Sequence, residues 1–286
     1  MTDVERVGIV GCGLMGSGIA EVCARAGRDV VVVETSRPAA DAGLGRIARS
    51  LSRAAAAGKL TAAERDAAVG RITMTTDMDR LTDRDLVVEA VAEDERAKLE
   101  VFARLDEVVE RRDAVLATNT SSIPVIRLAT ATSRPERVVG LHFFNPVPVL
   151  PLVELVPSLL TSEDTARRAR EFASEVLGKQ VVRAQDRSGF IVNALLVPYL
   201  LAAVRMAESR AASAEDIDRG MTLGCAHPLG PLALADLIGL DTVQAIARSL
   251  YAEYREPLYA PPPLLARMVD AGLLGRKTGR GFHAYP

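Results

Sequence analysis

Residues 11–16 read Gly-Cys-Gly-Leu-Met-Gly, a Gly-x-Gly-x-x-Gly motif that directly follows a β-branched stretch at residues 4–10. The motif opens a segment with helical character, residues 14–26, and residues 29–34 (DVVVVE) predict a second strand. Gly27 suits the C-cap of the helix. This order predicts a βαβ unit. In such a unit the first glycine permits a tight turn, the second lets a pyrophosphate approach the backbone, and the third lets helix and strand pack closely.

The same unit predicts how a dinucleotide binds. The predicted cofactor loop comprises Gly11, Gly13, Leu14, Met15 and Gly16. Glu34 lies about 20 residues beyond the glycines, where an acid accepts hydrogen bonds from the adenosine ribose hydroxyls. A carboxylate at this position repels a 2′-phosphate, so we expect NAD as the cofactor. Arg37 is close enough in sequence to leave NADP as the alternative.

Strands and helices alternate through the first two thirds of the chain and then stop alternating. Strands are predicted at residues 72–75, 85–91, 114–118, from 138, at 152–156 and 180–183, with helices at 38–57, 61–69, 95–111 and 163–177. Beyond residue 186 the pattern is only helical, at residues 190–208, 214–223, 231–254 and 263–271. We therefore predict an α/β fold. Residues 1–186 form a Rossmann-type, doubly wound NAD-binding domain, and residues 187–286 form an all-helical domain for substrate binding and dimerisation.

Residues 138–155, with the sequence VVGLHFFNPVPVLPLVEL, contain the strongest candidate for catalysis. His142 ends an apolar strand, and Glu154 follows twelve residues later, after a turn stiffened by Pro146 and Pro148. A carboxylate bonded to the imidazole would fix its tautomer and stabilise its protonated form, as a general base requires. The alternative interpretation is a buried structural histidine with Glu154 on an exposed face.

The predicted topology gathers polar residues at one edge of the sheet. In open α/β sheets, ligands bind beyond the carboxyl ends of the strands. The glycine loop, Glu93, residues 118–122 and His142 all follow or end such strands. We therefore expect the Ser121 hydroxyl, His142 and a carboxylate to lie beside the nicotinamide.

Composition excludes several classes of protein. The chain has 286 residues, of which 49% are apolar and 25% charged, as in ordinary globular proteins. The net charge of −2 supplies no basic field for nucleic acid, and no apolar run reaches the ~20 residues of a membrane span. The three cysteines are too few and scattered for a disulfide framework or a zinc site. We expect no metal site and a cytoplasmic location.

Several motifs, taken together and in this order, resemble the 3-hydroxyacyl-CoA dehydrogenase family, and within it the bacterial enzymes for 3-hydroxybutyryl-CoA. The matching segments are residues 11–16, 119–122, 142–146 (HFFNP), 151–154 (PLVE), 188–193 (SGFIVN), 227–231 (HPLGP) and 275–282 (GRKTGRGF). The resemblance extends from about residue 5 to the C-terminus. The chain departs from the family's pattern at Pro151, Ala194 and His283, where many members have Lys, Arg and Tyr.

The resemblance implies an NAD-dependent (S)-3-hydroxyacyl-CoA dehydrogenase that interconverts 3-hydroxybutyryl-CoA and acetoacetyl-CoA. His142 matches the family's catalytic base and Glu154 its partner carboxylate. Ser121 and Asn193 match residues that hydrogen bond around the 3-oxygen and thioester of the substrate. Residues that match the nicotinamide end of the cofactor site are Glu93, Lys98 and Asn145. The implied partner is an acyl-CoA.

The sequence leaves three alternative functions open. An enzyme for free 3-hydroxy acids would need a lysine base, but residues 190–208 contain no Lys. A non-catalytic nucleotide-binding protein would lack the His–Glu pair. Oxidation of polyketide extender units on an acyl carrier protein is the third alternative.

A basic segment and the apolar helices also bear on ligands and partners. We interpret the basic residues as a solvated helix face, with the phosphates of coenzyme A as the alternative ligand; these residues are Arg46, Arg49, Arg53 and Lys59. Apolar residues on several faces of residues 190–206 and 232–250 favour a homodimer through the helical domain.

Overall fold

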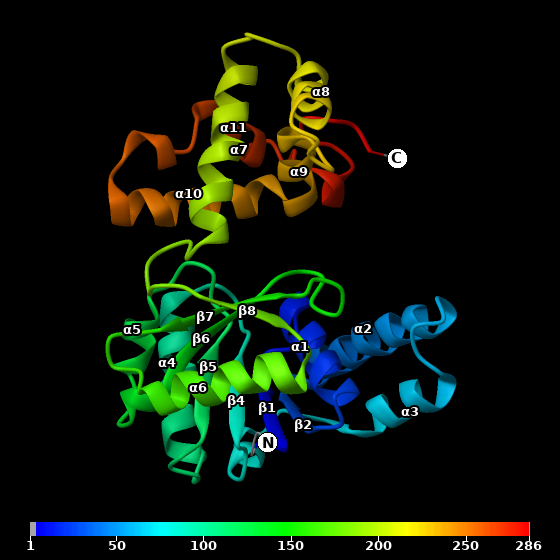
Figure 1. Cartoon of the computed structure of the whole chain (residues 1–286), viewed down its shortest axis with the longest axis vertical. Helices are drawn as coiled ribbons and strands as arrows, with labels where there is room; N and C mark the ends of the chain where they lie inside the picture. Colours follow the sequence, from blue (N-terminus) through cyan, green and yellow to red (C-terminus); the bar gives the residue numbers. More distant parts are fainter. Residues whose placement is uncertain (1–3, 286) are drawn as a thin grey trace. The chain divides into compact units, whose positions relative to one another are not determined.

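The computed structural model describes residues 4–285 and consists of two compact units, Met1–Arg187 and Ser188–Pro286. The predicted boundary, between residues 186 and 187, differs from this division by one residue. The first unit is α/β and the second is helical (Figure 1). The predicted fold class is confirmed.

The first unit is built on an eight-stranded sheet with the order β3-β2-β1-β4-β5-β6-β7-β8. The strands are β1 (Arg6–Val10), β2 (Asp29–Val33), β3 (Ile72–Thr75), β4 (Leu86–Glu89), β5 (Val115–Thr118), β6 (Val138–Phe143), β7 (Leu152–Pro157) and β8 (Gln180–Arg183). All neighbours are parallel except β6 and β7, which are antiparallel. An antiparallel pair needs only a turn to connect it, so β6 returns directly into β7.

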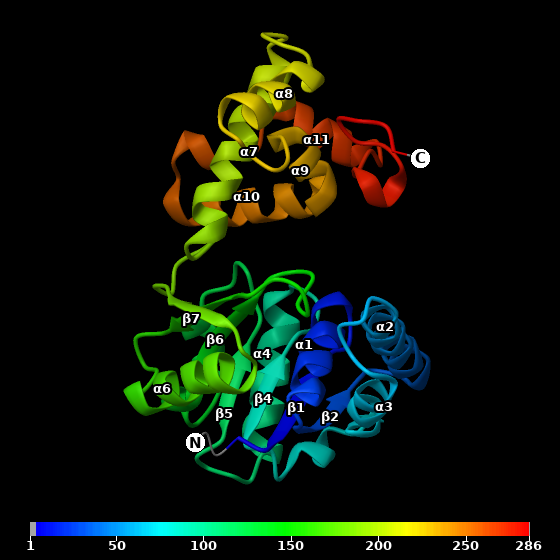
Figure 2. The same ribbon diagram turned by 45° about the vertical axis from the view of Figure 1, so that its right-hand side comes forward.

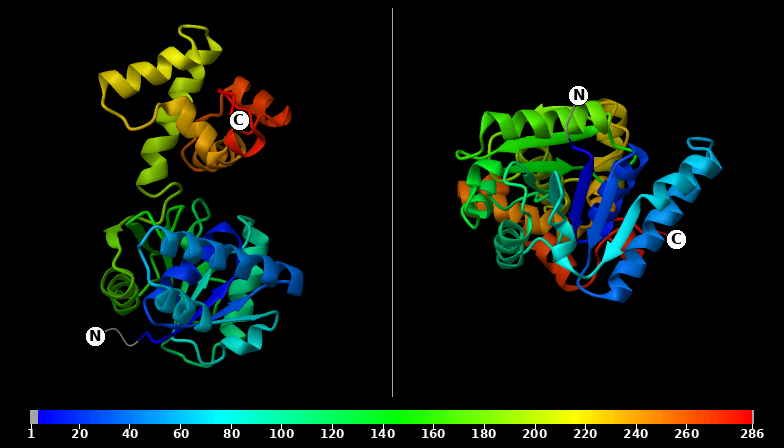
Figure 3. Two further views of the ribbon diagram at one scale, coloured as in Figure 1. Left: turned by 90° about the vertical axis from the view of Figure 1, so that its right-hand side faces the viewer. Right: turned by 90° about the horizontal axis from the view of Figure 1, so that it is seen from below.

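Helices cover both faces of this sheet. They are α1 (Leu14–Arg25), α2 (Arg37–Ala56), α3 (Ala62–Gly70), α4 (Glu95–Val108), α5 (Val125–Ala129) and α6 (Glu163–Glu171). Helices α1 and α6 share one apolar core with the strands, while α4 and α5 lie on the opposite face (Figure 1). Helices α2 and α3 pack together beside β3, at one side of the unit (Figures 2 and 3). The five-residue α5 was not predicted because it is too short to show a helical period.

Strand β1 shows why the sequence covers both faces. Its Val7 and Ile9 are fully buried in the core that includes Ile19 of α1. Gly8 faces the other way, and a Cβ there would lie 2.8 Å from the Leu81 side chain. Because side chains alternate along a strand, a β1 that has no polar side chain from Val7 to Val10 must be buried on both faces, as in a central parallel strand.

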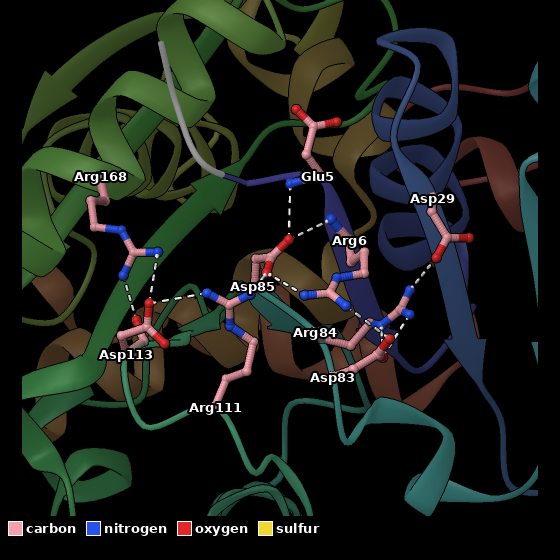
Figure 4. Close-up of polar contacts among 9 residues, drawn as sticks. All are labelled: Glu5, Arg6, Asp29, Asp83, Arg84, Asp85, Arg111, Asp113 and Arg168. Carbon is pink, nitrogen blue, oxygen red and sulfur yellow. Dashed lines mark hydrogen bonds and ion pairs between the residues drawn. The ribbon is translucent and has the colours of Figure 1, made fainter.

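Asp85 is the centre of a polar network at the amino-terminal edge of the sheet (Figure 4). It directly precedes β4 and is only 2% exposed. The backbone N–H groups of Glu5 and Arg6 donate to its Oδ2 at 3.0 and 2.8 Å, and Arg111 Nη1 lies 2.8 Å from Oδ1. Further members of the network are Asp29, Asp83, Arg84, Asp113 and Arg168. The network ties together the starts of β1, β2, β4 and β5, at the edge opposite the predicted site.

We expect Asp85→Ala to lower the free energy of unfolding by about 2–3 kcal/mol, because two partly buried backbone N–H groups and two guanidinium groups lose their acceptor. The two arginines that pair with Asp85, Arg6 and Arg111, are each about one third exposed, which limits the effect on stability. Urea denaturation followed by circular dichroism measures the change. Asp66→Ala, which removes an exposed carboxylate on α3, is the control and should leave the midpoint unchanged.

The second unit comprises α7 (Val192–Glu208), α8 (Ala214–Gly224), α9 (Pro231–Ile238), α10 (Leu240–Tyr254) and α11 (Pro263–Asp270). Helices α7, α9 and α10 pack against one another around an apolar core of their own (Figure 2). The single helix predicted at residues 231–254 is wrong: it is two helices, α9 and α10, separated by Gly239. The positive φ of 101° at Gly239 breaks the helix there, and the Leu240 N–H donates to Leu274 O instead.

Two buried aspartates hold the C-terminal segment of this unit on the helices. Asp236, 1% exposed, accepts hydrogen bonds from the N–H groups of Phe282 and His283 at 2.9 Å. The imidazole Nε2 of His283 lies 2.8 Å from Asp218 Oδ2, so the residue that departs from the family's pattern has a structural contact. Lys277 forms an ion pair of 2.6 Å with Asp241.

Candidate active site

The glycine loop has the shape that a dinucleotide requires. Gly11 has φ +88°, and a Cβ at Gly16 would lie 1.9 Å from the Gly11 carbonyl oxygen. At Gly13, by contrast, an added Cβ would meet nothing within 4 Å, so the backbone is open to a ligand. Gly13 is also the N-cap of α1, and no side chain caps that helix. The first N–H groups of α1, around Leu14 and Met15, therefore suit a pyrophosphate.

Glu34 is fixed against this loop at the end of β2. The Cys12 N–H donates to its Oε1 at 2.5 Å, and the Thr35 N–H donates to its Oε2 at 3.0 Å. Arg46 Nη2 donates to the Cys12 carbonyl at 2.5 Å and so holds the loop from the other side. Arg37, the residue that left NADP open, lies 3.7 Å from Asp41. The position of Glu34 suits a carboxylate that accepts hydrogen bonds from the ribose hydroxyls, and it fits NAD.

We expect Glu34→Ser to raise the KM for NADH about tenfold, because the loss of a charge-assisted hydrogen bond to the ribose costs on the order of 1.5 kcal/mol. The KM for NADPH should fall in the same variant, because a 2′-phosphate no longer meets a carboxylate. Steady-state kinetics with both cofactors measures the ratio. Glu100→Ser, on the exposed side of α4, is the matched control. An unchanged ratio of the two KM values would contradict the role of Glu34.

A buried ionic network lies beyond the carboxyl end of β4. Lys98 is 1% exposed, and its Nζ lies 2.6 Å from Oε1 of the fully buried Glu89 and 3.3 Å from Oε2 of Glu93. The Thr118 hydroxyl at the end of β5 donates to Glu89 Oε2 at 2.7 Å. The structure therefore brings Glu93 and Lys98 together as one group. Thr118 belongs to the predicted segment 118–122, but Glu89 was missed in the sequence, although a glutamate inside the apolar run DLVVEAV was a usable signal.

Glu93 in turn holds the loop that carries Ser121. Its Oε1 accepts hydrogen bonds from the Ser121 N–H at 2.9 Å, the Ser122 hydroxyl at 2.9 Å and the Thr120 hydroxyl at 2.6 Å. Partial burial disfavours ionisation of this carboxyl, but the charge of Lys98 and these hydrogen bonds outweigh it and hold the pKa of Glu93 below its ordinary value. Glu93 therefore stays ionised, and the position of Ser121 depends on it.

His142 and Glu154 are opposite each other on the antiparallel strands β6 and β7. His142 Nδ1 lies 2.7 Å from Glu154 Oε2, which is the hydrogen bond that the sequence predicted. The imidazole is 6% exposed and the carboxylate is fully buried. The ring of Phe144 packs edge-on against the imidazole at a centroid distance of 4.6 Å. When Nδ1 donates to this carboxylate, the lone pair of the neutral imidazole lies on Nε2.

The remaining predicted residues lie in two different places. Asn145 follows β6 in the turn toward β7, and the Phe143 N–H donates to Asn119 Oδ1 at 2.9 Å, which ties this strand end to the Ser121 loop. Asn193 lies in the second unit, in the first turn of α7, and is 9% exposed. Burial raises the pKa of the Cys12 thiol to about 11, a change that Arg46 opposes and Glu34 reinforces, so this thiol is not a nucleophile.

Residues 4–285 contain neither a metal-binding cluster nor a membrane-spanning helix. In that range, no group of three or more His, Cys, Asp or Glu side chains could hold a metal ion. Within the same described part of the chain, no helix is long and apolar enough to span a bilayer.

The open glycine loop, Glu34 and the buried His–Glu pair define a dinucleotide-dependent oxidoreductase. The family model for the 3-hydroxyacyl-CoA dehydrogenase NAD binding domain matches residues 6–187, and the model for the C-terminal domain matches residues 189–285. The chain belongs to the 3-hydroxyacyl-CoA dehydrogenase family.

Individual relatives are similar over the whole length. The chain is 61% identical over 286 residues to 3-hydroxybutyryl-CoA dehydrogenase of Mycobacterium tuberculosis, with 100% of both sequences covered. The crystal structure of FadB2 from M. tuberculosis matches with a TM-score of 0.98 and 61% identity over 99% of each chain. That of (S)-3-hydroxybutyryl-CoA dehydrogenase PaaH1 from Ralstonia eutropha matches with a TM-score of 0.94 and 45% identity, over 99% of this chain and 100% of the other.

Proposed function

We propose that this protein is an NAD-dependent (S)-3-hydroxyacyl-CoA dehydrogenase that interconverts 3-hydroxybutyryl-CoA and acetoacetyl-CoA. The observation that carries the proposal is the buried contact of 2.7 Å between His142 and Glu154, in the same unit as the open glycine loop. The names of the relatives from M. tuberculosis and R. eutropha support the four-carbon substrate.

His142 is the general base in this proposal. In the oxidative direction its Nε2 accepts the proton of the 3-hydroxyl group, and in the reductive direction it returns that proton to the 3-oxygen. Glu154, bonded to Nδ1, stabilises the imidazolium and keeps the ring in one orientation. NAD, when bound, supplies the acceptor for the hydride from C3. Ser121 donates a hydrogen bond to the 3-oxygen, and Asn193 hydrogen bonds the thioester end.

The remaining polar residues hold the cofactor rather than the substrate. Glu93, Lys98 and Asn145 orient the nicotinamide end, and Glu34 with the glycine loop binds the adenosine and pyrophosphate. The buried ion pair of Lys98 supports this assignment, because an ammonium fixed by two carboxylates has a defined position before any ligand arrives.

The arginines of α2 support a coenzyme A thioester over a free acid. Arg46, Arg49 and Arg53 line a cavity of about 200 Å³ together with α1 and the Asn145 turn. We propose that this cavity, rather than a purely solvated face, receives phosphate groups of coenzyme A, since guanidinium groups bind phosphate well. The relatives are named for coenzyme A substrates, and nothing favours the carrier-protein alternative.

We further propose a cytoplasmic homodimer that associates through the helical unit, which also binds substrate. Leu195, Leu223 and Leu237 of this unit are 73%, 74% and 52% exposed, which supports an apolar contact surface. Light scattering after size exclusion tests the proposal. A protein that stays monomeric at micromolar concentration would contradict it.

Turnover of acetoacetyl-CoA tests the proposed activity. We expect rapid loss of NADH absorbance with the thioester, little loss with free acetoacetate, and a higher KM for NADPH. Turnover only on the free acid would overturn the substrate assignment. Turnover only on an acetoacetyl carrier protein would restore the carrier-protein alternative. Bound NADH without turnover on any of these substrates would overturn the enzymatic role.

A further inference from the structure

Lys179 is a buried cation that the proposed mechanism does not use. It lies directly before β8 and is 7% exposed. Burial, together with the positive charge of Arg25, lowers the pKa of its ammonium. Within residues 4–285 no carboxylate forms an ion pair with it. A buried cation without a counter-ion is costly, so its hydrogen bonds must account for its position.

Those hydrogen bonds go to one turn. Lys179 Nζ donates to the carbonyl oxygen of Val147 at 2.5 Å and to that of Leu150 at 2.8 Å. The next residue continues the contact, because the Gln180 N–H donates to Pro151 O at 2.7 Å. The turn is residues 144–151, which connect β6 to β7 and include Asn145. Lys179 therefore fixes the peptide that leads from the strand of His142 to the strand of Glu154.

The opposite side of the turn rests on α1. A Cβ at Gly18 would lie 2.8 Å from Val147 Cβ, so this valine packs directly on the helix backbone. Helix α1 begins at the cofactor loop. The turn is thus held between the lysine on one side and the cofactor helix on the other. A shift of the turn would move Asn145 and the end of β6 relative to the glycine loop.

We propose that Lys179 is a positioning residue for the hydride and proton transfers. By binding two carbonyl oxygens of the turn, it sets the placement of Asn145 and His142 relative to the cofactor loop. This inference rests on the proposed dehydrogenase function. A misplacement of about 1 Å in such a site is enough to lower the rate about 100-fold.

Lys179→Met tests the inference, because methionine keeps the length and apolar stem but removes the donors. We expect kcat with acetoacetyl-CoA and NADH to fall about 10- to 100-fold. The deuterium isotope effect on kcat with NADH labelled at C4 should increase, because misplacement slows hydride transfer itself. A residue needed only for stability would leave that isotope effect unchanged. Lys179→Arg, which keeps donors, should recover part of the rate. Arg183→Met, on the exposed side of β8, is the control.

The outcomes separate the two proposals. Absence of turnover in the unmodified protein overturns the proposed function itself. Normal turnover there, with a folded Lys179→Met variant of equal kcat, KM and isotope effect, overturns the positioning role alone. If the methionine variant does not fold, Lys179→Gln, which keeps a shorter donor, is measured in the same way. Failure of both variants to fold also overturns the positioning role, because Lys179 is then required for the fold.

Discussion

Replacing His142 with glutamine lowers kcat for acetoacetyl-CoA reduction by about 10²–10⁴-fold, the usual contribution of a positioned general acid or base. Glutamine keeps a hydrogen-bonding group of similar reach on the buried strand β6, but it exchanges no proton at neutral pH. Glu34 and the glycine loop are untouched, so NADH should bind as in the unmodified protein. The rate falls in both directions of the reaction, because the same nitrogen takes and returns the proton.

Single-turnover kinetics and NADH fluorescence together check this result. The fluorescence titration gives the cofactor affinity, and rapid mixing gives the rate of the chemical step without product release. His227→Gln, a substitution of the same kind in the second unit, is the control for the chemical change. A His142→Gln variant that reduces acetoacetyl-CoA at the normal rate would remove His142 from the mechanism and return it to the structural interpretation.

Local features of the sequence predicted the sheet and the cofactor loop. The glycine loop depends on contacts within one βαβ unit: Gly16 must avoid the Gly11 carbonyl, and Glu34 bonds to Cys12. The helix predicted at residues 61–69 is α3, which begins with a capping box of Thr61 and Glu64, and β3 and β8 have the predicted bounds. In each case the determining neighbours are near in sequence, where periodicity and capping are informative.

The break between α9 and α10 could not be predicted in this way. Apolar residues recur at helical spacing through residues 231–254, and a glycine within a helix is tolerated. The break exists because Leu240 N–H bonds to Leu274 O, in a segment that comes later in the chain. The buried contacts of Asp218 and Asp236 with the C-terminal segment have the same origin. They are tertiary contacts that no local pattern contains.

The same difference between local and tertiary contacts applies to the candidate site. The pairing of His142 with Glu154 was predictable because a short stiff turn joins their strands, so their register follows from the chain itself. The contacts of Ser121 and Lys98 with Glu89 and Glu93 were not predictable in this way, because the two glutamates lie on or after β4, whereas Lys98 lies on α4 and Ser121 after β5. Glu89 and Lys179 are ionisable residues in buried positions, and only the fold shows which atoms form hydrogen bonds with each of them.

Replacing Glu154 with glutamine should lower kcat by about 10- to 100-fold, a smaller loss than at His142, because a hydrogen bond to a charged group contributes on the order of 1.5–3 kcal/mol. The amide oxygen can still accept the Nδ1 proton across the β6–β7 pair, so ring orientation is retained. The negative charge opposite the imidazolium is lost. KM for both substrates should change little, because the lost interaction strengthens only as the proton is transferred.

Two further variants decide between charge and orientation as the role of Glu154. Glu154→Ala removes both, so its kcat should fall below that of Glu154→Gln, and its stability should fall as well, since Nδ1 loses a buried acceptor. Glu100→Gln, on exposed α4, controls for the loss of one negative charge. If the glutamine variant were as active as the unmodified protein while the alanine variant were not, orientation alone would be the function of this residue. Equal losses in both would mean that the negative charge is the larger part, because stabilisation of a positive imidazolium in a buried site requires an opposite charge rather than a dipole.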